Sequence, residues 1–318
     1  MKWLPKIRFS MRTLFILVTV LCVLLVPLSV KLYQARQQRL VVQWVVANGG
    51  SAVYDNQQDL NPMVVSDTPK AIRWLRSVIG NDFFGTVIRV RINNPTVTDI
   101  SKLTYLRSLT FVSLEDPQNA DLSPLGSLKQ LNSVYITFSS EKSYTAKNIA
   151  ELSKLDCSLS VGITGQLIDD LTLIQSLKNI RLLNITDSQV TNLAPLINLD
   201  QLENLSIQRT PVKDISALYN LNRLTTLRLR NCQVNDFSQL SYLTQLRALT
   251  LDDPKITDLT PLVKLVKLHN LSLNTPMVKD HSPLENLVNL EMLIVSKAEF
   301  DKLKKALPRC IVFESSFK

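Results

Sequence analysis

Residues 252–262 read DDPKITDLTPL, and close copies of this stretch recur along the chain. Without gaps, TDSQVTNLAPL (186–196), QRTPVKDISAL (208–218) and NTPMVKDHSPL (274–284) follow the same order of apolar and polar residues at multiples of 22 residues. A fixed period of this length is typical of a solenoid, in which each unit packs on the next. The repeat therefore predicts an elongated stack of similar units.

Each unit opens with two apolar residues separated by one other residue, as in Leu205 and Ile207. This alternation indicates a short strand with one buried face. The extra residues of the third unit, SSEKSYTAKNIAELSKL (139–155), are interpreted as a longer helix on the convex side. The first apolar positions advance by 22 residues except for one step of 27, and they are Val90, Val112, Val134, Val161, Leu183, Leu205, Leu227, Leu249, Leu271 and Leu293.

Across residues 87–296 the pattern resembles the leucine-rich repeat, LxxLxLxxNxIxDIxPLxxL, in the 22-residue form of internalin-like bacterial proteins. The resemblance implies an α/β solenoid with a curved parallel sheet and short 3-10 or helical turns on the convex side. The Asn that forms a hydrogen-bonded ladder between turns in that family is absent, so we expect the turns to rely on backbone geometry. Its place is taken by Pro95, Pro117, Gln166, Ser188, Thr210, Cys232, Pro254 and Pro276.

An acidic residue or Asn stands nine positions after most of the first apolar residues. A carboxylate there is placed to accept hydrogen bonds from the free N–H groups of the turn that follows, which often begins with Ser or Thr and then Pro. We therefore assign this column to capping and none of it to catalysis. The column comprises Asp99, Asp121, Asp170, Asn192, Asp214, Asp236, Asp258 and Asp280.

The N-terminal segment has the features of a membrane anchor. Thr13 to Val30 is free of charge over eighteen residues, which at ~1.5 Å per residue matches the ~30 Å hydrocarbon core. A cleaved signal peptide is the alternative, but no small-x-small cleavage site follows. Basic residues before the span favour a cytoplasmic N-terminus, with the repeats outside, facing the periplasm from a bacterial inner membrane. Of the net charge of +9, residues 1–40 carry +7, so the high pI says little about the repeats.

The chain divides into six expected segments. The solenoid needs a cover at each end, and PKAIRWLRSVIG (69–80) and AEFDKLKKALP (298–308) are the helices expected to supply them. The basic start, the Gly-Gly after the anchor and the closing ALPRCIVF together resemble small membrane-anchored leucine-rich-repeat proteins of planctomycete bacteria, a resemblance that implies architecture only. The segments are a basic tail (1–12), the anchor (13–30), a juxtamembrane helix (31–50), an N-terminal cap (51–86), the solenoid (87–296) and a C-terminal cap (297–318).

The sequence offers no pattern for enzyme chemistry. No phosphate-binding or dinucleotide-binding glycine motif and no GxSxG occurs. His281 occupies an apolar column and His269 has no partner at metal-ligand spacing, so we expect neither to bind a metal. Cys157, Cys232 and Cys310 fit no disulfide or metal framework and are expected to be buried thiols. We therefore predict no catalytic site, no cofactor and no metal.

The concave strand face remains as the expected binding surface, because solenoids usually bind there. Its outward side chains are mostly small and polar, with Arg228 and Arg230 as directional charged donors. A continuous basic stripe with interleaved aromatics is missing, which disfavours nucleic acid. We therefore predict a protein or other macromolecular partner, with a structural envelope component or an accessory subunit of a membrane complex as alternatives. Candidate partner-binding residues are Asn204, Gln208, Arg228, Arg230, Asp252, Asn270 and Asn274, and Arg230 and Asp252 are expected to form an ion pair across neighbouring strands.

Overall fold

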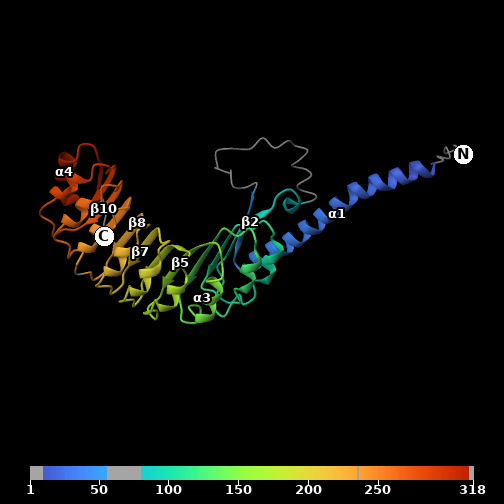
Figure 1. The fold of residues 1–318 in the computed structure, drawn as a ribbon, viewed down its shortest axis with the longest axis horizontal. Coiled ribbons are helices and arrows are strands. Elements are labelled where there is room, and N and C mark those ends of the chain that lie inside the picture. Colours follow the sequence, from blue (N-terminus) through green and yellow to red (C-terminus); the bar gives the residue numbers. More distant parts are fainter. Residues whose placement is uncertain (1–9, 56–79, 235, 315–318) are drawn as a thin grey trace.

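The computed structural model describes residues 10–55, 80–234 and 236–314. They form a curved stack of strands, with a long helix extending from one end and a short helix at the other (Figure 1). The sheet has 12 strands in chain order. The first pair is antiparallel and every later pair is parallel, as in β2 with β3 or β11 with β12. The structure thus confirms the solenoid with a parallel sheet.

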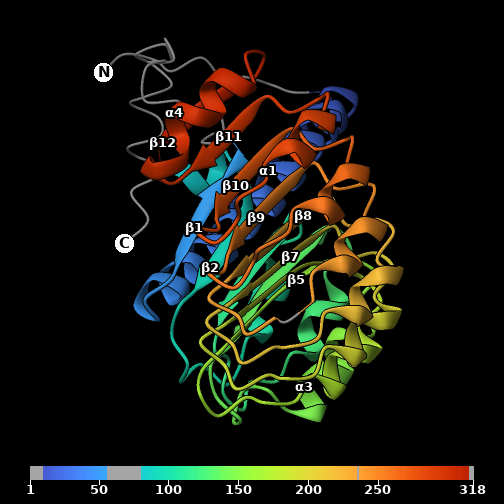
Figure 2. The ribbon, with the colours of Figure 1, turned by 90° about the vertical axis from the view of Figure 1, so that its left-hand side faces the viewer.

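Short 3-10 helices alternate with the strands and lie along one side of the sheet (Figure 2). The strands are β1 Ser51–Tyr54, β2 Val87–Ile92, β3 Phe111–Glu115, β4 Ser133–Phe138, β5 Ser158–Thr164, β6 Ile180–Thr186, β7 Asn204–Gln208, β8 Thr226–Arg230, β9 Ala248–Asp252, β10 Asn270–Asn274, β11 Met292–Val295 and β12 Ile311–Glu314. The α-helices are α1 Met11–Ala47, α3 Ala146–Leu152 and α4 Lys297–Ala306. The 3-10 helices are η2 Asn81–Phe83, η3 Ser101–Tyr105, η4 Ser123–Ser127, η5 Thr172–Ser176, η6 Ala194–Asn198, η7 Ser216–Asn220, η8 Ser238–Tyr242, η9 Thr260–Lys264 and η10 Ser282–Asn286.

The core is one continuous column of apolar side chains between the sheet and the 3-10 helices. In the seventh strand, Leu205 and Ile207 point inward and are at most 1% exposed, and Leu218 and Leu221 meet them from the convex side. Each such side chain contributes about 1.5–3 kcal/mol through burial. Since no unit can bury its face alone, stacking is what makes the fold stable.

The acidic column caps the 3-10 helices as predicted. Asp214 Oδ1 accepts the Ser216 N–H at 2.7 Å, and Asp258 Oδ1 accepts the Thr260 N–H at 2.8 Å. The hydroxyl of Thr260 also donates to Asp258 at 2.6 Å. Hydrogen bonds from the same turn lower the pKa of Asp258, so it stays ionised as an acceptor. Equivalent backbone bonds are made by Asp99, Asp121, Asp170, Asn192, Asp236 and Asp280.

The strand register differs from the prediction at the fourth unit. Val134 pairs with Leu159, whereas Val161 pairs with Ile136. An irregularity between Leu159 and Ser160 then restores the 22-residue register, so that Val161 pairs with Leu183. The index position Val161 is therefore in register with the fifth unit, as predicted, but two residues out of register with the third unit. The alternation of strand residues looks the same after a shift of two, which is why the sequence did not reveal it.

The extra residues of the third unit form α3, as expected, on the outer side of the arc (Figure 1). The segment is tied to the preceding turn by Asp116, which accepts the Ser139 N–H at 2.9 Å and the hydroxyl of Ser143. Ser143 is fully buried. A polar cluster thus holds the insertion in place.

The turns that leave the strands rely on backbone conformation, as predicted. Asp116, Asp187, Arg209 and Asn231 have φ between 48° and 51°, the left-handed region. In the column of the missing Asn, Thr210 Oγ1 and Cys232 Sγ lie 3.8 Å apart, while the buried hydroxyl of Ser188 has no partner. A side-chain link between successive turns is thus present at Cys232, whose Sγ also lies 3.5 Å from the Ile207 carbonyl oxygen, but it is missing at Ser188.

The segments predicted as an anchor and a juxtamembrane helix lie in the single helix α1. Gly49, with φ +70°, donates to the Val46 carbonyl at 3.0 Å, and Gly50 donates to the Val45 carbonyl at 2.9 Å. This bonding is a Schellman motif, which ends the helix at the predicted glycines. The chain then reverses into β1, which pairs with β2.

The last three turns of α1 cover the open N-terminal end of the solenoid. Ala35, Gln38, Val41 and Val45 are buried there. The predicted cap helix at 69–80 lies almost wholly outside the described residues. The sequence interpretation did not assign this covering role to α1.

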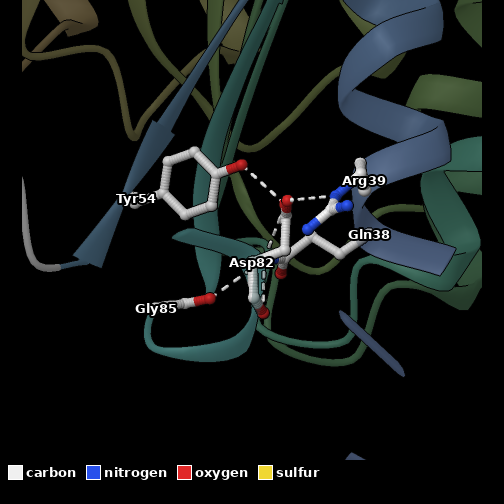
Figure 3. Close-up of polar contacts among 5 residues, drawn as sticks. All are labelled: Gln38, Arg39, Tyr54, Asp82 and Gly85. Carbon is white, nitrogen blue, oxygen red and sulfur yellow. Dashed lines mark hydrogen bonds and ion pairs between the residues drawn. The ribbon is translucent and has the colours of Figure 1, made fainter. Parts of the chain in front are cut away.

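A polar cluster fastens α1 to the solenoid (Figure 3). Gln38 donates to the Gly85 carbonyl at 2.9 Å. Asp82 accepts the hydroxyl of Tyr54 at 2.7 Å and pairs with Arg39 at 3.2 Å. Burial and the bond to Asp82 raise the pKa of the Tyr54 phenol, which therefore remains a donor.

At the C-terminal end, α4 and β12 form the expected cap. Leu303 is buried, and Phe300 and Leu307 pack partly against the core. His281 is buried, as predicted, and its Nε2 lies 3.2 Å from Glu299 Oε1 on α4.

The prediction of buried thiols holds for two of the three cysteines that follow the N-terminal helix. Cys157 and Cys232 are buried, and burial raises the pKa of both thiols. Cys310 is only half-buried because it lies in the turn between α4 and the edge strand β12.

Candidate binding surface on the concave face

Outward-facing strand residues form registered rows across the concave face. Thr137, Gly162, Asn184, Ser206 and Arg228 are successive partners on β4 to β8. Their neighbours along each strand are buried apolar residues, so the pleat directs these positions away from the core. A second row two residues further on runs from Thr164 through Thr186 to Gln208 and Arg230.

A hollow of about 430 Å³ lies over the middle of these rows. Small residues line its floor, namely Gly162, Thr186 and Ser206, and the larger Tyr135 and Arg228 line it on strands β4 and β8. Since short residues stand between two long ones, the sheet itself supplies a concavity.

The side chains of two neighbouring residues lie close to Gly162. A Cβ at this position would lie 2.8 Å from Thr137 Cγ2 and 3.6 Å from the Tyr135 hydroxyl oxygen. The first distance is shorter than carbon atoms tolerate, so any side chain here would displace Thr137. The absence of a side chain at Gly162 thus keeps the hollow open.

The hollow is polar and carries a single positive charge. Of the described residues that line it, only Arg228 is charged. Arg228 is exposed and forms no ion pair with any described residue. Gln208 donates to the Ser206 hydroxyl at 2.8 Å, which orients its amide. The arrangement offers hydrogen-bond donors, acceptors and one guanidinium, a set suited to recognition.

Two of the seven predicted binding residues, Gln208 and Arg228, line the hollow. The other five lie elsewhere on the same face. Asn204 and Asn270 begin strands β7 and β10, and Asn274 donates to Asp252 Oδ1 at 2.8 Å. The hollow is therefore smaller than the predicted surface and lies nearer the N-terminal end.

The expected ion pair between Arg230 and Asp252 is absent. The two residues are register partners on β8 and β9, as predicted. However, Asp252 accepts its hydrogen bond from Asn274, and the buried Nε of Arg230 has no partner. Adjacent strand positions bring side chains within reach but do not choose between competing partners.

Sequence reasoning missed Asn184, Thr186, Thr164 and Gly162. They stand one or three residues after the index positions Val161 and Leu183, on the outward face, but no candidate was taken from these two units. Gly162 was the available signal, because glycine is rare in this chain, with seven residues in all, and weakens a strand interior.

No family model matches the sequence, and no curated protein matches it. Among solved structures, internalin F from Listeria monocytogenes is similar with a TM-score of 0.47 and 24% identity, over 62% of this chain and 57% of that chain. Internalin C2 from the same organism has a TM-score of 0.45 and 27% identity, over 66% and 81% of the two chains. The chain thus spans little more than half of the length of internalin F. The 22-residue strand register and the capped 3-10 helices make the fold a leucine-rich-repeat solenoid.

Proposed function

We propose that this chain is a single-pass membrane protein that binds a protein partner through the hollow on the concave face of its repeats. The observation that carries the proposal is the combination at Gly162, Tyr135 and Arg228: an open polar concavity with an unpaired guanidinium at its edge. Among described residues, no group of three or more His, Cys, Asp or Glu is arranged to hold a metal. A binding role accounts for the site without any catalytic step.

The proposed topology rests on α1, which is long and apolar enough to cross a membrane as a span or to act as a signal sequence. Its first part is exposed and apolar, as in Phe15, Val23 and Leu24. A span with the basic N-terminus in the cytoplasm and the repeats outside, facing the periplasm, fits this distribution. The resemblance to anchored planctomycete proteins remains a prediction.

Site-directed photo-cross-linking tests the partner site. A photoreactive amino acid at Asn184, in the hollow, is compared with one at Asn222, an exposed Asn outside it. The full chain is needed, because a fragment that starts at residue 52 lacks the cover supplied by Gln38, Val41 and Val45. We expect a discrete cross-linked protein at Asn184 and none at Asn222.

The charge in the hollow is tested in the same assay. Arg228→Ala should reduce cross-linking at Asn184 about ten-fold or more, since a charge-assisted hydrogen bond contributes about 1.5–3 kcal/mol. Arg247 is an exposed arginine outside the hollow, so Arg247→Ala is the matched control and should leave the cross-linking yield at Asn184 unchanged. Equal yields from both variants would exclude the hollow as the partner site.

The alternative roles predict different results. A structural envelope component without a discrete ligand would give diffuse products at Asn184 and Asn222 alike. An accessory subunit of a membrane complex would cross-link through α1 instead of the hollow. Protease accessibility of the repeats in intact and permeabilised cells tests the proposed topology separately.

A further inference from the structure

A second cleft lies where α1 meets the solenoid, and it has no part in the concave surface. Its volume is about 200 Å³. One wall is the α1 segment with Lys31, Gln34 and Gln38, and the other carries Phe83 and Arg107 from the first units. Figure 3 shows the polar cluster of Gln38, Asp82 and Gly85 that lies at this junction.

The cleft carries two cations without acidic partners. Lys31 and Arg107 are exposed, and neither forms an ion pair with any residue that the structure describes. The Lys31 ammonium lies 4.7 Å from the centre of the Phe83 ring, which positions it in the cleft.

The two carboxylates of the cleft are engaged in hydrogen bonds. Asp55 accepts the backbone N–H and the hydroxyl of Thr86, both at 3.0 Å. Asp82 is held by Tyr54 and Arg39. The positive charges of Lys31 and Arg107 are therefore available to an anion.

The position of the cleft along α1 indicates which kind of anion it would meet. Lys31 is the first charge after the apolar run that ends at Val30. Residues 31 to 34 lie within ~6 Å of that end at 1.5 Å per residue. The headgroup layer is ~5–7 Å thick on each side of the hydrocarbon core. Tyr105, which is 56% exposed and lines the same cleft, is the type of aromatic residue enriched at this depth.

We infer that this cleft binds the phosphodiester headgroup of a membrane phospholipid, with Lys31 and Arg107 as the contacting cations. The inference rests on the proposed membrane anchoring of α1. Because α1 continues without a break from the apolar run to Gln38 and Val45, a bound headgroup would fix the base of the solenoid against the membrane surface.

Lipid titration of the full chain in mild detergent, followed by native mass spectrometry, tests the inference. Wild type should bind one phosphatidylglycerol saturably and bind diacylglycerol, which lacks the phosphate, far more weakly. Lys31→Gln with Arg107→Gln should weaken binding about 25-fold, at about five-fold per cation near a membrane surface. Lys31→Arg with Arg107→Lys, which keeps both charges, should retain binding.

Lys102→Gln is the matched control. Lys102 also lies over an aromatic ring of α1, that of Trp44 at 5.4 Å. Trp44 is thirteen residues beyond Lys31, which places this pair ~20 Å further from the apolar run. Lipid binding by Lys102→Gln should equal that of wild type.

Three results would overturn the inference. They are equal lipid affinity in wild type and the double Gln variant, equal affinity for phosphatidylglycerol and diacylglycerol, and complete displacement of the lipid by millimolar inorganic phosphate, which would mark a general anion site.

Alkaline extraction of cell membranes separates the proposed membrane anchoring from the proposed lipid site. Release of the chain would refute the anchoring and with it the lipid site, whereas a retained chain with equal affinities would refute the lipid site alone.

Discussion

Gln38 on α1 and Val87 on β2 are joined through the side-chain amide of Gln38, whose Oε1 accepts the Val87 N–H at 3.0 Å. The same amide donates to the Gly85 carbonyl at 2.9 Å. Gln38 is 9% exposed and Val87 is fully buried. One side chain therefore satisfies two backbone groups at the start of β2.

Gln38→Leu should destabilise the fold, because the Val87 N–H and the Gly85 carbonyl would each lose a partner in a buried setting. The cost is about 1–3 kcal/mol for each group. Urea unfolding of the full chain in detergent, followed by circular dichroism, measures it. Gln37→Leu, one residue away with no side-chain hydrogen bond among those described, should change stability by less than about 0.5 kcal/mol. Similar losses for both variants would contradict this role of Gln38.

The buried pair of His281 and Glu299 should couple the last repeat to α4. Their side chains are 8% and 11% exposed. His281→Leu restores the apolar type of its column. Among the described residues it leaves Ser296 as the only side-chain partner of the buried Glu299 carboxyl group, so we expect the free energy of unfolding to fall by about 1–3 kcal/mol. His281→Leu with Glu299→Met should recover most of that loss, because apolar replacements of a buried polar pair are often neutral. If the stability losses of the two single variants add up in the double variant, the two side chains act independently.

Acid should weaken the attachment of the insertion at Asp116. Burial raises the pKa of Asp116, but hydrogen bonds from Ser143, Gln118 and Ser139 outweigh this effect and hold it at about 2, below the ordinary 3.8. A lowered folded-state pKa contributes stability above the unfolded-state value and loses it as the pH falls through the folded-state value. The contribution should therefore be complete above about pH 4 and fade toward pH 2.

Asp116→Asn isolates that contribution, since Asn tolerates the left-handed backbone at this position (φ 48°). The variant should be less stable than wild type by about 1 kcal/mol at pH 7, after allowance for solvent exposure. The difference should shrink between pH 4 and pH 2 in urea unfolding series. A difference that does not depend on pH would rule out the carboxylate as its origin.

Gly162→Ala should narrow the hollow with little effect on stability. The new methyl group would lie 2.8 Å from Thr137 Cγ2, so that side chain must move. The resulting strain is offset because alanine reduces the conformational freedom of the unfolded chain. The free energy of unfolding should therefore change by no more than about 1 kcal/mol. Cross-linking of the partner from Asn184 should fall several-fold. Gly126→Ala, where nothing lies within 4 Å of the new Cβ, should leave cross-linking unchanged and should not lower stability.

The columns of Leu, Ile and Val predicted the solenoid because each unit is a local pattern that is repeated many times. The capping role of Asp214 and Asp258 was equally local, since the carboxylate and its N–H partner are two residues apart. Predictions that required a choice among several neighbours were less successful. Asp252 lies between Arg230 and Asn274 in register, and the structure pairs it with Asn274.

The sequence by itself determined the repeat, its inward-facing residues, the caps of its turns and the apolar character of α1, because all of these depend on spacing along the chain. Only the tertiary structure decided that Gln38, 49 residues before Val87, covers the end of the sheet, that Val134 pairs with Leu159, and that Gly162 opens a hollow between Tyr135 and Arg228. These features depend on distances between chain segments far apart in sequence. Side-chain packing sets those distances, and residue spacing alone does not encode them.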